Sequence, residues 1–204
     1  MRLVPTEDEV VELLERTGGL RHGHFELPNG LHGNNYLQVA LTMRYYQHAK
    51  VLSVSLSRLV RANPEIRAHI PQLSIVAPAT AGLPVAYGVC EALQAHQVYW
   101  AEKDDEHLPM RFRQFLEQAP GEKVLLADDI LRSGTKLAQL KTLVESRGAE
   151  VVGIAVIVYQ PMPKTVDFGP VPFFYLAKLD GHYFQDAASC DQCKRGAPVE
   201  KVWI

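Results

Sequence analysis

Two adjacent aspartates, Asp128 and Asp129, stand between an apolar run and a turn of small polar residues. The run 124–127 is typical of a buried strand, and the turn 133–135 opens an amphipathic helix. In an open α/β sheet, ligands bind beyond the carboxyl ends of the strands. A helix N-terminus offers unpaired N–H groups and a favourable dipole to a phosphate. Because carboxylates accept hydrogen bonds from vicinal hydroxyl groups, directly or through a hydrated cation, the segment predicts a ribose 5-phosphate site.

The turn itself has the residue types that such a site needs. Gly134 lets the backbone approach a phosphate, and Ser133 and Thr135 add hydroxyl donors. The alternative is structural: the acids would be the polar end of a strand, with Asp129 or Ser133 as a helix cap. The complete order of strand, acids, turn and helix favours the phosphate site.

The elements around this segment alternate between strand-like and helix-like patterns. An N-terminal helix begins with a capping box of Thr6 and Glu9, and a second helix spans about 45–62. Strand-like runs follow at 73–77, 97–103, 123–129, 150–159 and 171–179, with 110–116 as a strand or hairpin arm; helices are expected at 83–93 and 135–148. Such alternation predicts an α/β fold with a central, mostly parallel sheet flanked by helices.

Length and composition limit the functional classes. The 204 residues suit a single domain over 1–204, and 47% hydrophobic and 22% charged residues are ordinary globular values. A formal net charge of −2 gives no basic field, so nucleic acid is not an expected partner. Neither a signal peptide nor a membrane-spanning apolar run is recognisable. We expect a soluble, cytoplasmic protein without membrane contact.

The three cysteines are too few for a secreted disulfide framework. Cys190 and Cys193 form a CxxC pair, but a closed zinc site needs four ligands. The pair is expected to be reduced and structural; in the alternative, His182 or a second chain completes a metal site. His22, His24 and His32 lie on a glycine-rich stretch and fit no standard zinc spacing, so we assign no metal-ligating residue.

The segment 124–135 resembles the phosphoribosyl pyrophosphate motif of type I phosphoribosyltransferases, which is an apolar strand, two acids and a Thr-Gly-rich loop. Further similarity is to the orotate branch of that family, in particular its bacterial and archaeal members with a C-terminal CxxC tail. The segments that carry it are 23–38, 77–82, 101–103, 190–193 and 196–198.

The resemblance implies a type I phosphoribosyltransferase fold whose sheet is covered by a small hood, built from about 18–42 and 160–204. It implies a transfer of the phosphoribosyl group, held with Mg²⁺, to a nitrogen of a base such as orotate in pyrimidine biosynthesis, with release of pyrophosphate. It also implies a homodimer with a shared active site.

By the same resemblance, Asp128 and Asp129 hold the ribose hydroxyls, and Lys103 of a neighbouring subunit neutralises the pyrophosphate; these three are the expected catalytic residues. Arg111 and Arg113 are candidates to assist Lys103. The pyrophosphate is expected on the backbone of Thr80, Ala81 and Gly82. The 5-phosphate is expected on Ile130, Leu131, Arg132, Ser133, Gly134 and Thr135.

The base-binding positions depart from the orotate pattern. Gln160 stands where that branch has Asp-Arg, and Arg132 stands at a loop position usually held by Thr. A charge-assisted hydrogen bond contributes roughly 1.5–3 kcal/mol, so losing the arginine at 160 would cost about tenfold to a hundredfold in affinity. Arg132 either points to solvent or supplies the missing cation. Tyr36 either stacks on the base or packs the hood, and we assign Tyr36, Arg132 and Gln160 to the base.

Two other functions remain open. One is the same chemistry on a different base, because the recognition residues differ. The other is a non-catalytic sensor of phosphoribosyl pyrophosphate, which predicts an added DNA-binding module or a basic face. The chain has no recognisable helix-turn-helix extension and no basic excess, and it retains Lys103 and both acids. These features favour an enzyme.

Overall fold

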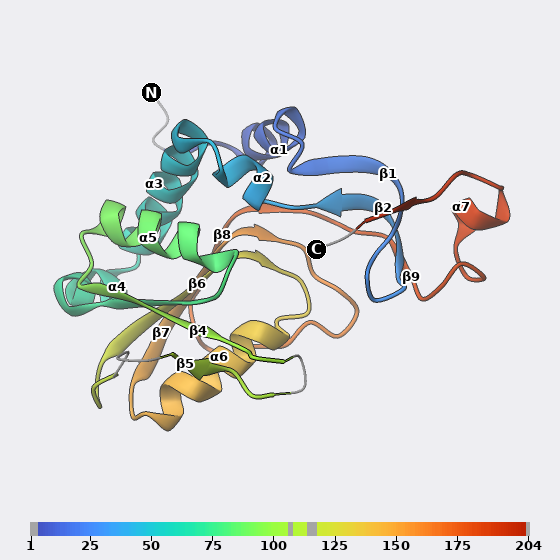
Figure 1. Ribbon diagram of the computed structural model, residues 1–204. Helices are drawn as coiled ribbons and strands as arrows, with labels where there is room; N and C mark the ends of the chain where they lie inside the picture. The colour runs from blue at the N-terminus through green and yellow to red at the C-terminus, as the bar shows by residue number, and fades with distance from the viewer. Residues whose placement is uncertain (1–3, 106–107, 114–117, 203–204) are drawn as a thin grey trace.

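The computed structural model describes residues 4–105, 108–113 and 118–202. Its main sheet has the strand order β5-β4-β3-β6-β7-β8 (Figure 1). All neighbours run parallel except the edge pair β4 and β5, which is antiparallel. The strands are β3 (Ser74–Pro78), β4 (Gln97–Glu102), β5 (Arg111–Phe112), β6 (Lys123–Leu131), β7 (Glu150–Tyr159) and β8 (Phe173–Lys178). The predicted mostly parallel sheet is confirmed.

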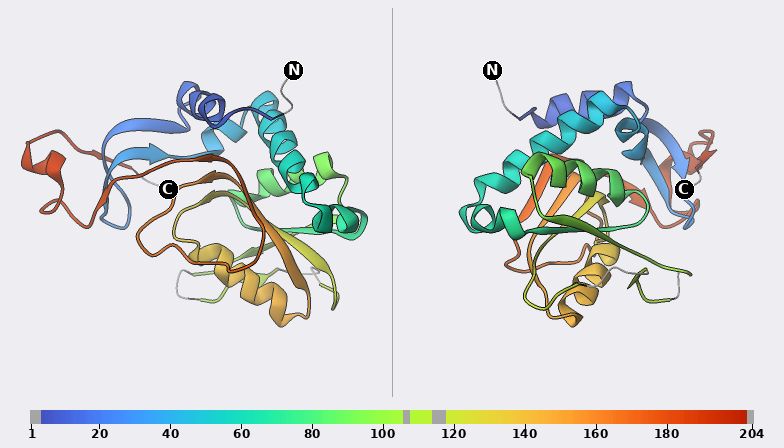
Figure 2. Two further views of the ribbon diagram at one scale, coloured as in Figure 1. Left: turned by 180° about the vertical axis from the view of Figure 1, so that it is seen from behind. Right: turned by 60° about the vertical axis from the view of Figure 1, so that its left-hand side comes forward.

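Helices cover both faces of this sheet, as Figure 2 shows from two sides. One hydrophobic core contains side chains of α1, α3, α4 and α5, and a second contains side chains of α6. Neighbouring residues of β6 divide between them: Leu125 belongs to the first core and Leu126 to the second. The helices are α1 (Glu7–Arg16), α2 (Ala40–Met43), α3 (Tyr46–Ala62), α4 (Pro64–His69), α5 (Gly82–Leu93), α6 (Thr135–Ser146), α7 (Asp191–Lys194) and the 3-10 helix η1 (Ile70–Gln72).

A second, four-stranded sheet forms the hood, with the order β10-β1-β2-β9. Its strands are β1 (Leu20–Glu26), β2 (His32–Leu37), β9 (Tyr183–Phe184) and β10 (Glu200–Lys201). Residues near both ends of the chain meet here, because β10 pairs in parallel with β1. The helix α7 lies at the far end of the hood, away from α4, in both views (Figures 1 and 2).

Most predicted elements form where the local pattern places them. The capping box of Thr6 and Glu9 starts α1 as predicted. The short helix α4, which was not predicted, begins at Pro64 with Asn63 as its N-cap. One boundary was wrong: the stretch 160–204 is not all hood, because β8 pairs with β7 in the main sheet. The expected arm at 110–116 forms β5, and residues 114–116 lie outside the described residues. No helix in the described ranges has the length and apolar character needed to cross a bilayer.

Candidate active site

Asp128 and Asp129 lie near the carboxyl end of β6, and each residue is only 6% exposed. The backbone N–H of Asp129 donates to Oδ1 of Asp128 at 2.9 Å. Burial raises the pKa of Asp128 well above its ordinary value, and the neighbouring charge of Asp129 raises it further. Burial also raises the pKa of Asp129, although Arg132 and Lys136 oppose that shift. Two acids held in this way are poised to ionise fully when donors or a cation bind them.

The predicted pyrophosphate loop lies beside these acids. It connects β3 to α5, and a Cβ placed on Gly82 would lie 3.1 Å from Oδ1 of Asp128 and 3.0 Å from Pro78. The first turn of α5 therefore approaches Asp128 as closely as glycine allows. Thr80 and Ala81 are exposed or nearly so, and a cis peptide bond joins Ala79 to Thr80. The sequence-predicted residues of two separate loops thus converge at one edge of the sheet.

The loop between β6 and α6 is held by hydrogen bonds from the segment that follows β7. The hydroxyl of Thr165 donates to the carbonyl of Arg132 at 2.7 Å, and the N–H of Val166 donates to the carbonyl of Ser133 at 2.8 Å. Gly134 has φ +78°, and a Cβ there would lie 3.1 Å from Val166. Glycine is therefore required both by the backbone angle and by the space.

The same loop carries the two hydroxyl groups, of Ser133 and Thr135, that were predicted to bind the phosphate. The N–H of Thr135 donates to Oγ of Ser133 at 3.3 Å, and the two hydroxyl oxygens lie 3.1 Å apart. Both residues are exposed, and Thr135 is the first residue of α6. The arrangement places two hydroxyls at the positive end of a helix dipole, which suits a phosphate.

Lys103 directly follows β4, in the connection to β5. The two arginines that were candidates to assist it are engaged in ion pairs. Arg111 pairs with Asp104, and Arg113 pairs with both Asp104 and Glu102. Both arginines therefore stabilise the β4–β5 hairpin in this structure, and the expected role toward pyrophosphate stays with Lys103 as a prediction.

Arg132 does not point freely to solvent. Its Nε donates to Oε1 of Gln160 at 2.9 Å, and its Nη2 donates to the carbonyl of Leu37 in the hood at 2.8 Å. Gln160 is fully buried, so it cannot touch a ligand in this arrangement. Instead it holds the guanidinium. Two of the three residues predicted at the base end, Arg132 and Gln160, are therefore direct partners.

Two residues that the sequence did not single out complete this network. The Nε2 of Gln160 donates to Oδ1 of Asn35 at 3.1 Å, and the hydroxyl of Tyr183 donates to Oε1 of Gln160 at 2.7 Å. Their only advance signal was polar character within predicted hood sequence. Two ring contacts of Tyr36 lie within the hood: its ring centroid is 5.9 Å from that of Phe25 and 6.0 Å from the guanidinium carbon of Arg21. These contacts belong to hood packing.

The donor set at Asp128 and Asp129 fits a hard cation such as Mg²⁺. This ion binds oxygen ligands and commonly takes one or two carboxylates together with substrate phosphates. Both carboxyls have raised pKa values because they are buried, so a divalent cation nearby would favour their ionised form. The chemistry of the donor set therefore agrees with the predicted cofactor.

Comparisons with known proteins agree with this geometry. A family model described as the phosphoribosyl transferase domain matches residues 56–171, which include both loops and the two acids. The orotate phosphoribosyltransferase of Thermotoga maritima is 33% identical over 192 residues, covering 94% of this chain and 96% of that relative. The enzyme of the same name from Thermus thermophilus is 31% identical over 194 residues, covering 95% of this chain and 100% of that relative.

Solved structures show the same fold. The orotate phosphoribosyltransferase of Mycobacterium tuberculosis, crystallised with inorganic phosphate, aligns with a TM-score of 0.61 at 18% identity, covering 85% of this chain and 95% of that one. The orotate phosphoribosyltransferase of Aeropyrum pernix aligns with a TM-score of 0.61 at 18% identity, covering 83% of this chain and 93% of that one. The chain belongs to the phosphoribosyltransferase family and groups with its orotate phosphoribosyltransferases.

Proposed function

We propose that this protein transfers the phosphoribosyl group of phosphoribosyl pyrophosphate to a ring nitrogen of orotate and releases pyrophosphate. The observation that carries the choice of base is the position of Arg132. Its guanidinium is fixed by Gln160 and Leu37, in the loop that joins Asp129 to the phosphate turn. This cation offsets the missing arginine at position 160, because orotate carries a carboxylate that a guanidinium recognises.

The donor is held by the two acids and two helix N-termini. Asp128 and Asp129 accept hydrogen bonds from the ribose hydroxyls. The 5-phosphate binds the N-terminus of α6 with the hydroxyls of Ser133 and Thr135. The pyrophosphate group binds the N-terminal turn of α5 at Thr80, Ala81 and Gly82. Because the two loops converge beside Asp128, the sugar is fixed between the phosphate at one end and the leaving group at the other.

The chemical step breaks the bond between the anomeric carbon and the pyrophosphate oxygen, which keeps the electron pair, and forms a bond to the base nitrogen, whose N–H proton is released. Positive charge develops on the sugar and negative charge on the leaving group, so the site acts chiefly by positioning and electrostatic stabilisation. Lys103 neutralises the leaving pyrophosphate. Asp128 and Asp129 would hold Mg²⁺, which would supply further neutralisation of that charge.

The base is positioned by Arg132, with Gln160, Asn35 and Tyr183 holding the guanidinium in place. The Nη1 group of Arg132 has no acceptor among the described residues, so it is available to a carboxylate.

Two parts of the proposal concern assembly and location: Lys103 reaches the site of the second subunit in a homodimer, and the enzyme works in the cytoplasm. The first is tested below by mixing variants.

The test is a pyrophosphate-release assay with phosphoribosyl pyrophosphate, Mg²⁺ and matched bases. Orotate and uracil differ by the carboxylate, so they isolate the contribution of Arg132. We expect orotate to exceed uracil in kcat/KM by at least about tenfold, the lower limit for one charge-assisted contact. In Arg132→Ala that preference should vanish while the dissociation constant of phosphoribosyl pyrophosphate changes little.

Other outcomes would redirect the proposal. Equal turnover of orotate and uracil by the wild type would remove Arg132 from base recognition. A preference for adenine or another base would keep the family chemistry and change the substrate. Tight binding of phosphoribosyl pyrophosphate without turnover of any base would indicate a sensor rather than an enzyme.

A further inference from the structure

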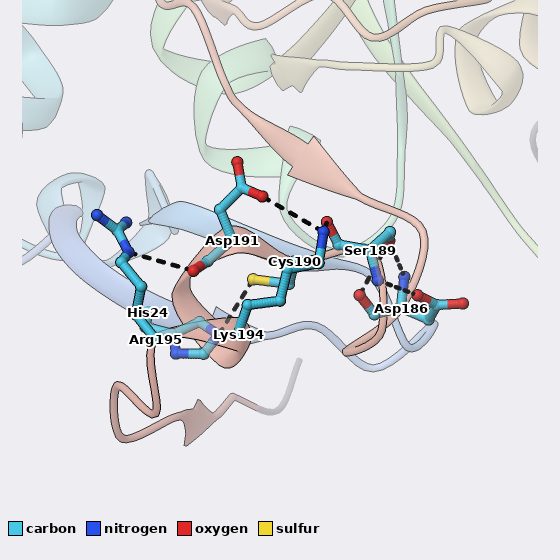
Figure 3. A network of polar contacts seen from close by, with 7 residues as sticks. All are labelled: His24, Asp186, Ser189, Cys190, Asp191, Lys194 and Arg195. Carbon is cyan, nitrogen blue, oxygen red and sulfur yellow. Dashed lines mark hydrogen bonds and ion pairs between the residues drawn. The ribbon is translucent and has the colours of Figure 1, made fainter.

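Four side chains with metal-binding atoms converge in the hood, away from the residues of the proposed active site. They are His24 on β1, His32 on β2, Cys190 just before α7 and Cys193 within it. Their ligand atoms all lie within 4.8 Å of one another. His24, His32 and Cys190 are buried, and Cys193 is partly buried. Figure 3 shows Cys190 pointing at the ring of His24 from the loop that carries α7.

The distances resemble those around a tetrahedral ion. Nε2 of His24 lies 3.1 Å from Nδ1 of His32 and 3.4 Å from each of the two sulfurs. Sγ of Cys193 lies 3.4 Å from Nδ1 of His32. A zinc ion with ordinary bond lengths holds nitrogen pairs about 3.3 Å apart and nitrogen–sulfur pairs about 3.6 Å apart. A small outward shift of these atoms would therefore accommodate it.

Hydrogen bonding alone does not explain the cluster. Nδ1 of His24 lies 3.1 Å from the carbonyl oxygen of Ala197, an acceptor, so Nδ1 is the protonated nitrogen. In the neutral ring Nε2 then has a single lone pair, yet three ligand atoms surround it. A carbonyl that fixes the tautomer of a histidine in this way is the usual outer contact of a metal-bound imidazole.

We propose that His24, His32, Cys190 and Cys193 bind one structural zinc ion. Two imidazoles and two thiolates are a ligand set that zinc takes in closed, four-coordinate sites. All four positions come from the protein, so the ion has no open position for catalysis. Both cysteines are free of disulfides, as expected from the sequence. The histidines that join them are those of the β1–β2 hairpin rather than His182.

The ion would join the two ends of the chain. It ties the C-terminal segment around α7 to the β1–β2 hairpin, next to the parallel pair of β1 with β10. The same hairpin supplies Asn35 and the Leu37 carbonyl to the network around Arg132. Zinc would therefore stabilise the part of the hood that faces the base, and its free energy of binding would add to the stability of the folded hood.

The first test measures metal in the purified wild-type protein by mass spectrometry after expression with and without added zinc. We expect about one zinc per chain. The double variant Cys190→Ser/Cys193→Ser should retain less than about a tenth of that amount, whereas Cys90→Ser, which changes the remaining cysteine outside the cluster, should retain all of it. Zinc retained by the double variant would overturn the assignment.

A second test uses the wild type alone and so does not depend on folding of a variant. Chelator-treated protein is titrated with Co²⁺, and visible absorption and sulfur-to-cobalt charge-transfer bands report tetrahedral thiolate coordination. We expect saturation at one Co²⁺ per chain, displacement by zinc and a rise in Tm with zinc. Failure to bind either metal, with both thiols titratable, would overturn the proposal and would leave the phosphoribosyltransferase assignment untouched.

Discussion

Arg132 donates from Nε to Oε1 of Gln160 across 2.9 Å, with Gln160 in turn fully buried beneath the hood. Two substitutions that each depart from the orotate pattern are thus direct partners in the folded protein. An arginine at position 160 would place a second positive charge next to Arg132 and repel it. The neutral amide of Gln160 instead accepts a hydrogen bond from the N–H of Arg132. Under the proposed function, Arg132 of the phosphate loop supplies the cation for the base, and the hydrogen bond to Gln160 holds its guanidinium in that position.

This pairing predicts the effect of Gln160→Glu. A carboxylate at that position would pair with Arg132 and compete with the orotate carboxylate for the same guanidinium. We expect KM for orotate to rise at least about tenfold, which is the lower limit for losing one charge-assisted hydrogen bond. KM for phosphoribosyl pyrophosphate should stay within about twofold of the wild type. Steady-state kinetics with each substrate varied in turn measures both constants.

The control for this variant is Tyr183→Phe, which removes the second hydrogen bond to Oε1 of Gln160 without adding charge. It should raise KM for orotate by a smaller factor. Equal effects of the two variants would mean that packing, rather than competition for the guanidinium, controls recognition of the base.

The donor half of the site could be predicted from the sequence because its residues are local. Asp128, Asp129 and Gly134 lie within one strand, turn and helix, and the order of these elements fixes where the side chains go. The base half could not. Arg132 meets Gln160 through the pairing of β6 with β7. It meets Leu37 only after the hood folds onto the main sheet, and no periodicity encodes that contact.

The buried acids predict opposite effects of Asp128→Asn on stability and activity. Because burial raises the folded-state pKa of Asp128, the folded protein binds more protons than the unfolded chain between about pH 4 and that raised pKa. The free energy of unfolding of the ligand-free protein therefore falls as pH rises through this window. An asparagine side chain does not ionise, so in the variant the free energy of unfolding should no longer fall with pH through this window.

At neutral pH we expect ligand-free Asp128→Asn to have a higher Tm than the wild type, by about 2–4 °C for each kcal/mol gained. Turnover should fall by about tenfold to a hundredfold, because the contact that we propose between the ionised acid and the sugar is gone. Thermal melts at several pH values, without ligand, give the first result. A lower Tm at neutral pH would show that the acid stabilises the free protein.

Gly82→Ala tests whether the two loops converge as the structure places them. The added methyl would lie 3.1 Å from Oδ1 of Asp128 and 3.2 Å from Ala77, so the acid or the helix must shift by a few tenths of an ångström. Alanine otherwise suits the first turn of a helix better than glycine does. We expect a rise of about tenfold or more in KM for phosphoribosyl pyrophosphate, with Tm changed by no more than a few degrees.

The control is Ala81→Gly, which removes an exposed methyl from the same loop without crowding Asp128. It should leave KM for phosphoribosyl pyrophosphate within about twofold of the wild type. If both variants raise KM alike, loop flexibility and not the contact with Asp128 accounts for the result.

The sequence contains all four residues of the cluster proposed to bind zinc, but their spacing along the chain does not show that they meet. His24 and His32 flank the turn that contains Asn29 and Gly30, so a hairpin would bring them together. Cys190 and Cys193 lie far later in the chain, as the separation of 166 residues between Cys190 and His24 shows. The pairings of β9 with β2 and of β10 with β1, on either side of the two cysteines, close that distance. Strand pairing between chain ends is not encoded in local sequence.

The last prediction concerns Lys103, which we expect to act in the site of the partner subunit. Lys103→Ala and Asp128→Asn should each abolish most turnover as homodimers. A heterodimer with one chain of each kind keeps one intact site if the lysine crosses over, because the Asp128→Asn chain lends Lys103 to the chain that retains Asp128. Heterodimers purified with two different affinity tags should then recover about half of the wild-type activity. If Lys103 serves its own chain, every site in the heterodimer has one lesion, and activity stays at the level of the homodimeric variants.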